Sequence, residues 1–193
     1  YAGSGINTTS SVNLSVTGDQ EAAGAYFPTV DFSYYQTNAS PGQDISGNHT
    51  FNAGTYSGIW YINGNVTINS NVTINGTVVT TKKITCSNKT NVTVNPTSPN
   101  PALIANDAIG FSRSDTVTIS GLVYAGADGT GSFDASRTVD LAFTGTAISP
   151  QQIDLSRSED AVIVYDSDIL TSPPPGMLGG SSGITVSAWD EVY

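Results

Sequence analysis

The sequence predicts an all-β protein, a right-handed β-solenoid (β-helix) with an irregular aromatic N-terminal cap and a Pro-rich C-terminal strap. Three observations predict this fold. A six-residue alternation of polar and apolar residues runs through 58–87, a longer recurrence of about 20 to 24 residues follows from 112 onward, and Pro, Gly, Asn and β-branched residues dominate the composition. These residue types favour strands and turns over helix. The 193 residues suffice for a single domain with a buried core.

We expect residues 1–57 to form an N-terminal extension and cap that packs on the solenoid. Most aromatic residues of the chain lie between 26 and 62, and this segment lacks the regular alternation that follows it. Trp60 and Tyr61, near its end, are candidates for capping the solenoid or for contacts between subunits.

We expect the solenoid itself to span 58–170. Its first part contains five hexapeptides, GIWYIN, GNVTIN, SNVTIN, GTVVTT and KKITCS. Four of them begin with Gly or Ser, which suits a bent backbone at a corner. Most carry apolar residues at their third and fifth positions, which would point inward, while Asn and Thr would point outward. Three hexapeptides would then make one coil of about 18 residues.

After a Pro-rich insertion at 88–110, the recurrence lengthens. Ser-Arg-Ser or Ser-Arg-Thr stands at 112–114, 136–138 and 156–158, and an alternating apolar run follows each tripeptide. One coil per tripeptide would align three arginines on one edge, with acidic residues close by in the sequence: Arg113, Arg137 and Arg157 with Asp115, Asp140 and Glu159. We interpret this edge as a solvated corner, where an ion pair contributes about 0–1 kcal/mol. A ligand-binding arginine stripe is the alternative.

We expect residues 171–193 to form a C-terminal strap and strand. Three successive prolines in Thr171-Ser-Pro-Pro-Pro-Gly176 lack the N–H groups that a ladder needs. Ile184, Val186 and Trp189 then predict a short final strand that caps an end of the solenoid or contacts a neighbouring subunit.

Charge and composition exclude several classes of partner. Six Lys and Arg stand against sixteen Asp and Glu, a net charge of −10, which argues against nucleic acid and anionic lipid. No run of about 18 apolar residues predicts a membrane span. Only 11% of residues are charged, against about 25% in average soluble domains. This neutral polar composition favours an extracellular or cell-surface location.

Cys86 is the only cysteine, so it forms no internal disulfide. It lies two residues after Ile84, so both side chains should point to the same, inward side of the strand, which predicts a buried thiol. A disulfide between subunits is the alternative.

Nine Asn-X-Ser/Thr sequons predict N-linked glycans, and no cofactor is expected. The acceptor residues are Asn7, Asn13, Asn38, Asn48, Asn65, Asn71, Asn75, Asn88 and Asn91. The alternative is a compositional effect, in which Asn and Thr on solenoid faces stack and bond to one another.

The sequence predicts no enzyme, no catalytic residue and no metal site. His49, the single histidine, lies in a sequon and has no Ser or Cys nucleophile motif near it. Asp128 and Asp134 flank a Gly-rich loop and are interpreted as turn formers, with a calcium site as the weaker reading because the spacing is not that of an EF-hand. Asp166 and Asp168 form a second pair of carboxylates on one face, and they are interpreted in the same way.

Two other function classes stay open. A carbohydrate-binding or carbohydrate-active β-helix, lyase-like or hydrolase-like, would use Trp60, Tyr61, Tyr34 and Tyr35 to stack on sugars. An ice-binding solenoid would use rows of Thr, although the rows here are short and lie beside Asn.

Five stretches carry a family likeness: VTISGLVYAG (117–126), LAFTGTAIS (141–149), AVIVYDSDIL (161–170), PPPGML (173–178) and VSAWDEVY (186–193). With them, residues 50–193 resemble the secreted β-solenoid region of PilX-type type IV pilus-assembly proteins and related polymer-forming surface proteins. The resemblance implies a non-catalytic, extracellular protein associated with pili or other cell-surface proteins. The predicted function is a self-assembling subunit of a filament, sheath or surface layer, whose partners are copies of itself.

Overall fold

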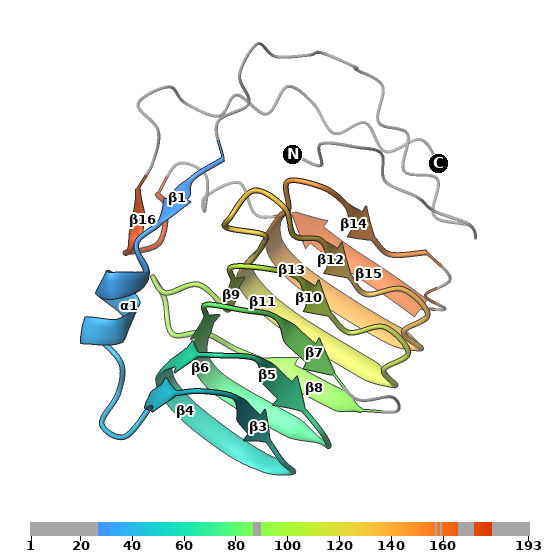
Figure 1. Ribbon diagram of the computed structural model, residues 1–193. Helices are drawn as coiled ribbons and strands as arrows, with labels where there is room; N and C mark the ends of the chain where they lie inside the picture. The colour runs from blue at the N-terminus through green and yellow to red at the C-terminus, as the bar shows by residue number, and fades with distance from the viewer. Residues whose placement is uncertain (1–26, 87–89, 157, 159, 166–171, 179–193) are drawn as a thin grey trace.

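The computed structural model describes residues 27–86, 90–156, 158, 160–165 and 172–178. Parallel strands stack into a β-solenoid of about six turns, with 51% strand and 4% helix (Figure 1). The predicted all-β solenoid is therefore confirmed. No helix among these residues is long and apolar enough to cross a membrane.

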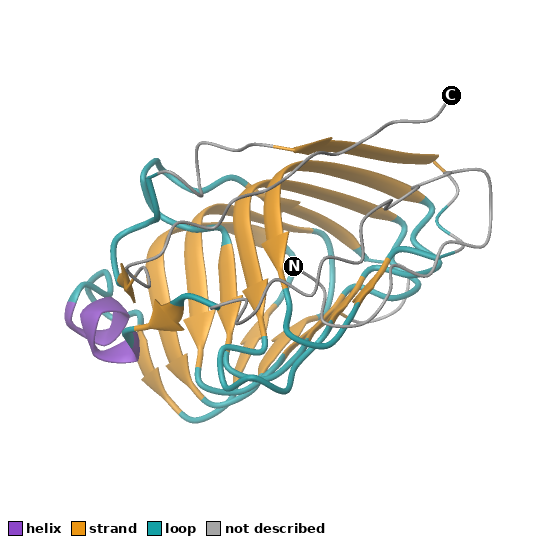
Figure 2. Ribbon diagram, turned by 90° about the horizontal axis from the view of Figure 1, so that it is seen from above, coloured by secondary structure: helices purple, strands orange, loops and turns teal. Residues whose placement is uncertain are grey.

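Two parallel sheets run along the solenoid (Figure 2). The longer sheet contains β2 (Asp44–Ser46), β4 (Gly54–Asn63), β6 (Val72–Thr80), β8 (Asn91–Val94), β11 (Thr116–Ala125), β13 (Asp140–Ile148) and β15 (Asp160–Tyr165), with β9 (Leu103–Ala105) beside β6 and β11. The shorter sheet contains β3 (His49–Phe51), β5 (Val66–Ile68), β7 (Ile84–Cys86), β10 (Ile109–Gly110), β12 (Phe133–Asp134) and β14 (Ile153–Asp154).

The longer sheet is divided by stacked glycines, so that each coil has three faces. Gly58 pairs with Gly76, and Gly121 with Gly145, in the strand registers. Gly58 and Gly121 both have φ of 92°, a backbone conformation that suits glycine. We call the strand segments before these glycines face 1, the segments after them face 2, and the shorter sheet face 3.

The strand registers match the repeats of the sequence. Gly54 pairs with Val72 and Val66 with Ile84, so a coil of the hexapeptide region contains 18 residues (72 − 54 and 84 − 66). In the later coils Thr116 pairs with Asp140, a step of 24 residues (140 − 116). Asp140 then pairs with Asp160, a step of 20 residues (160 − 140). Three hexapeptides therefore make one coil in the first region, and the longer recurrence is itself one coil in the second.

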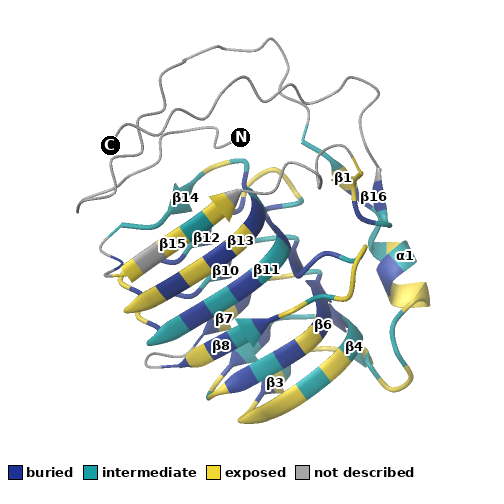
Figure 3. Ribbon diagram, turned by 180° about the vertical axis from the view of Figure 1, so that it is seen from behind, coloured by how far each residue is buried: buried dark blue, intermediate teal, exposed yellow. Residues whose placement is uncertain are grey.

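The inward side chains form one continuous core. The third and fifth residues of the hexapeptides are buried from Ile62 to Cys86, and along face 1 buried residues alternate with more exposed ones (Figure 3). Cys86 is a free buried thiol, which agrees with the first of the two readings. Thr80 lies in the same inward column, and its hydroxyl donates a hydrogen bond to the carbonyl of Gly64.

Face 2 is apolar on its outer side as well. In register along it lie Tyr61, Val79, Ile104, Tyr124 and Ile148, and all five are buried in a second hydrophobic cluster. We call this row the outer column.

A cover formed by both ends of the described chain buries the outer column. It consists of β1 (Thr29–Val30), α1 (Phe32–Thr37) and β16 (Met177–Leu178), and β1 pairs with β16 in antiparallel fashion. The Tyr35 hydroxyl donates to the Pro175 carbonyl at 2.6 Å, and the Tyr124 hydroxyl donates to the Pro28 carbonyl at 2.9 Å. The cover is therefore fixed both to itself and to the solenoid.

The N-terminal boundary differs from the predicted one. β2 and β3 pair with β4 and β5, so the first coil begins at Asp44 and not at Gly58. Residues 27–39, expected within a cap that packs on the solenoid, lie along its side, where they cover the apolar outer column. The prolines at 173–175 leave the coils and lead into β16, as a strap would.

Candidate assembly and glycosylation surfaces

Four rings of the first coil fill the N-terminal end of the core. Phe51 lies at the centre, with ring centroids 4.7 Å from His49, 4.8 Å from Tyr56 and 5.1 Å from Trp60. The His49 ring also stacks on Trp60 at 5.2 Å. We call these four residues the aromatic plug. Edge-to-face rings at such distances contribute about 0.5–1.5 kcal/mol per pair beyond their burial.

Two polar groups of the aromatic plug form hydrogen bonds, and a third, on His49, does not. The Tyr56 hydroxyl donates to the Asn52 carbonyl and the Trp60 indole N–H donates to the Ser57 carbonyl. The Nε2 atom of His49 is buried and has no partner. Burial lowers the pKa of His49, because the charged imidazolium would be poorly solvated there.

The predicted capping residues are divided between different places. Trp60 belongs to the aromatic plug and lies at an end of the core, as a cap would. Its neighbour Tyr61 points to the other side of the strand, where it is buried under the cover. Ile184, Val186 and Trp189 lie outside the residues that the structure describes.

The core is incompletely covered at both ends. Among the described residues, seven apolar ones pack against the core while staying partly exposed, and every one lies in the first or the last coil. They are Ile45, Tyr56 and Trp60 at the N-terminal end, and Ala147, Ile153, Leu155 and Ile163 at the other. On β15, Val162 and Val164 are 62% and 51% exposed.

The sequon asparagines of the coils stand in stacked pairs. The Oδ1 atom of Asn48 accepts from the backbone N–H of Asn65 at 2.8 Å and from its side-chain amide at 3.2 Å. The side-chain amide of Asn91 donates to Asn71 at 3.1 Å. Asn75 is exposed. Asparagines that stack and bond to one another are what the alternative to glycosylation describes. Attachment of glycans to these residues stays a prediction.

The remaining sequons lie elsewhere. Asn38 is exposed at the end of α1, and its amide donates to the Tyr34 carbonyl at 2.8 Å. Asn7, Asn13 and Asn88 fall outside the described residues.

Rows of threonine accompany the asparagines. Thr55, Thr73, Thr93 and Thr118 are in register on face 1. A second row on face 3 contains Thr50, Thr67 and Thr85. In the first coils, the outward surface of both faces is therefore neutral and polar.

The outward surface becomes acidic toward the last coils. Asp134 pairs with Asp154 on face 3, and Asp140 with Asp160 on face 1. Asp134 and Asp154 each accept the backbone N–H two residues later, from Ser136 and Ser156, which is the geometry of a turn.

The candidate calcium residues act as turn formers in the same way. Asp128 accepts hydrogen bonds from the backbone and hydroxyl groups of Thr130 at 2.9 and 2.8 Å, and Asp134 caps its own turn. Within the described ranges, no three His, Cys, Asp or Glu side chains gather as metal ligands do. The structure does not bring Asp128 and Asp134 together in such a group.

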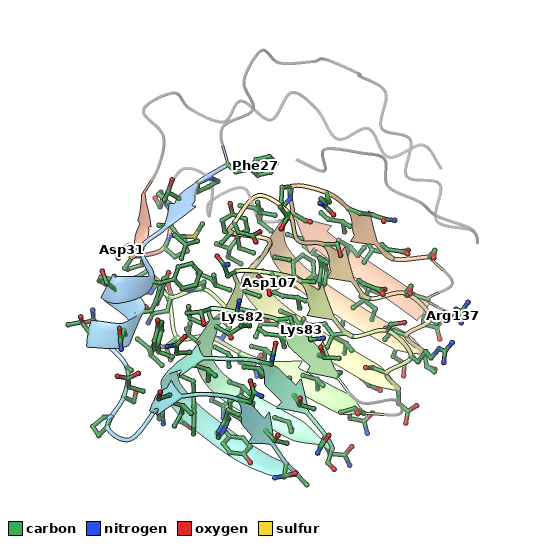
Figure 4. The ribbon with its side chains drawn as sticks, in the orientation of Figure 1. Phe27, Asp31, Lys82, Lys83, Asp107 and Arg137 are labelled. Atoms are coloured by element: carbon green, nitrogen blue, oxygen red, sulfur yellow. The ribbon has the colours of Figure 1, made fainter. Side chains whose placement is uncertain are left out.

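The Ser-Arg-Ser/Thr tripeptides form a corner. The backbone N–H of Arg113 donates to Ser136 and that of Arg137 to Ser156, so the two arginines occupy equivalent places in successive coils. Both are exposed and have positive φ, and the Arg137 side chain points into solvent (Figure 4). Neither has an ion-pair partner in the described part of the chain, so Asp115 and Asp140 do not neutralise them. Arg157 and Glu159 are outside it.

The proposed sugar-stacking aromatics do not share one platform. Tyr35 and Tyr61 are buried under the cover, Trp60 lies in the plug, and Tyr34 is half-buried on α1. Asp166 and Asp168 belong to the residues left undescribed. The sequence analysis missed the inward positions of His49, Phe51 and Tyr56. His49 and Phe51 lie two residues apart, and this alternation would have indicated that both point inward.

Comparisons of this chain with protein-family models, with curated proteins and with solved structures found no match.

Proposed function

We propose that this protein is a structural subunit that assembles with copies of itself into an extracellular filament, sheath or surface layer. The observation that carries the proposal is that, in the part of the chain that the structure describes, the core stays partly exposed in its first and last coils. Strand edges at the ends of a solenoid pair readily with other strands unless they are covered. The neutral rows of Thr and Asn on faces 1 and 3 suit a surface whose solubility does not depend on charge.

The sequence resemblance to PilX-type and polymer-forming surface proteins supports the same proposal, and with it the proposal of a cell-surface location. We further propose that several exposed sequons carry N-linked glycans, with Asn75 the most accessible of those in the coils because it is exposed and lies outside the two amide pairs.

Electron microscopy tests the proposal. The full chain is purified under native conditions and imaged by negative stain across a range of concentrations, while light scattering gives its mass. We expect ordered polymers that grow with concentration. A protein that stays monomeric throughout and degrades polyuronate would contradict the proposal and favour the carbohydrate-active alternative.

Glycopeptide analysis of protein from its native host tests the second part. Glycan mass on the Asn75 peptide is expected, and unmodified asparagines throughout would remove the glycan proposal without affecting assembly.

A further inference from the structure

We propose that copies of this chain join head to tail, with the last coil of one copy stacked on the first coil of the next. This inference rests on the proposed function, and it adds the two contact surfaces and their polarity. Its partner is a second copy of this chain.

The first surface is the edge formed by β3 and by residues 54–57 of β4. On β3, the N–H of His49 and the carbonyl of Phe51 bond toward the second coil. Since alternate residues of a parallel strand bond to opposite sides, Thr50 directs its backbone groups away from the solenoid. The N–H of Gly54 also bonds toward the second coil, so Thr55 faces away in the same manner. Behind this edge lies the aromatic plug.

The second surface is the edge formed by β14 and β15. β15 pairs only with β13, and β14 only with β12, among the described strands. Ile153, Leu155 and Ile163 lie partly exposed at this end of the core. It therefore offers unpaired strands around an aliphatic surface, which complements the aromatic surface at the other end.

Strand direction favours a head-to-tail arrangement. Every strand pair within the two sheets of the solenoid is parallel, and a head-to-tail neighbour continues this direction on all three faces. A head-to-head or tail-to-tail neighbour would instead meet each strand in antiparallel orientation. The head-to-tail contact is heterologous, so it leaves a free end and builds an open filament, whereas a two-fold contact stops at two copies.

Charge favours the same arrangement. The last coil carries Asp154 and Asp160 on its outward faces, each already paired with an aspartate of the coil before. A tail-to-tail contact would add two more aspartates to these rows, and like charges directly opposite one another are destabilising. A head-to-tail contact places the carboxylates near the neutral Thr50 and Thr55 rows of the next copy.

Two variants of the full chain block one surface each. The head variant, Thr50→Pro with Thr55→Pro, removes N–H groups from the exposed edge, where proline discourages strand addition. The tail variant, Ile163→Lys, places an inward charge at the open end of the core. A second tail variant, Val162→Lys, changes a side chain that is 62% exposed and so leaves the core packing intact. Thr118→Lys, in the middle of face 1, is the matched control.

Mixing the variants reveals the polarity. We expect wild type and Thr118→Lys to polymerise, while the head variant and Ile163→Lys need at least about 100-fold higher protein concentration, because a lost donor or a charge is buried unpaired in the contact. Val162→Lys keeps its charge on the outward side of the edge strand, so it should raise the required concentration less. A one-to-one mixture of head and tail variants is expected to form dimers and nothing longer, since one intact head meets one intact tail. Dimer formation and circular dichroism show that both variants are folded.

Several outcomes overturn the inference. If both end variants polymerise like wild type, the copies pack through their sides, and the proposed function survives while the head-to-tail contact does not. If either variant alone forms closed dimers, the contact is two-fold. A wild type that never polymerises removes the proposed function together with this inference.

Discussion

Gly76→Ala tests whether the stacked glycines determine how closely the coils approach. A Cβ atom on Gly76 would overlap the carbonyl oxygen of Gly58, and it would lie 2.8 Å from the nitrogen and 2.9 Å from the carbonyl carbon of Gly58. Real Cβ atoms essentially never come within 3.0 Å of other heavy atoms. All three contacts are backbone, so no side chain can rotate away, and the first two coils must separate.

The expected cost follows from the pairing around this point. β4 and β6 pair over their length from Gly54–Val72 to Ile62–Thr80, so a local separation disturbs bonds on both faces. Overpacking in a rigid interior costs about 1–3 kcal/mol, and because only backbone can move we expect the upper end, about 3 kcal/mol. In a domain of this size, that lowers Tm by about 6–12 °C.

Gly110→Ala is the matched control. A Cβ atom there meets nothing within 4 Å, and the residue does not have positive φ. The same substitution should therefore change the unfolding free energy by less than about 0.5 kcal/mol or stabilise slightly. Urea denaturation of both variants is the assay. Equal stabilities for Gly76→Ala and Gly110→Ala would refute the account of the corner.

Three further predictions concern single side chains. Tyr35→Phe removes the 2.6 Å hydrogen bond to Pro175 and should lower the unfolding free energy by about 1–2 kcal/mol. Tyr34→Phe, at a half-buried position of the same helix, should change it little, and equal effects would contradict the proposed role of the cover. Burial lowers the pKa of His49, so on acidification the unfolded chain binds a proton at this residue before the folded chain does. The unfolding free energy should therefore be unaffected by His49 above about pH 6.5 and should fall as the pH drops from there to the lowered pKa. Denaturation curves at about pH 7.5 and 5.5 should show this loss for wild type and not for His49→Phe. Burial also raises the pKa of the Cys86 thiol, so native protein should resist maleimide and run as a monomer on non-reducing gels, while unfolded protein should react; a disulfide-linked dimer would show that Cys86 bridges subunits.

Much of the solenoid could be predicted from the sequence because its core repeats. Val66, Ile68, Val72 and Ile74 occupy inward positions that recur every six residues, and three such repeats make the 18-residue coil. The first coil escaped prediction because most of its inward residues are rings and not aliphatic side chains. His49 and Phe51 pair with Val66 and Ile68 and point inward as they do. An imidazole and a phenyl ring do not continue the Val and Ile pattern, so the sequence did not reveal that they belong to the same repeat.

The cover could not be derived from local pattern. The outer column alternates with the core residues along the same strands, so face 2 is apolar on both sides and gives no amphipathic signal. Pairing of β1 with β16 joins Thr29 to Leu178, and nothing near either residue in the sequence points to the other. Of the candidate sites, the sequence located Trp60 at an end of the core, but it could not separate Trp60 from Tyr61, which faces the cover.

The axial repeat of the polymer tests the central claim most directly. Strands of neighbouring coils lie about 4.8 Å apart, and the subunit has about six turns, so a head-to-tail filament should repeat every ~29 Å along its axis. Cryo-electron microscopy of wild-type filaments should show this subunit repeat together with a layer line near 4.8 Å, with the strands perpendicular to the axis. Filaments whose strands run along the axis, or whose subunits meet through their faces, would contradict the account.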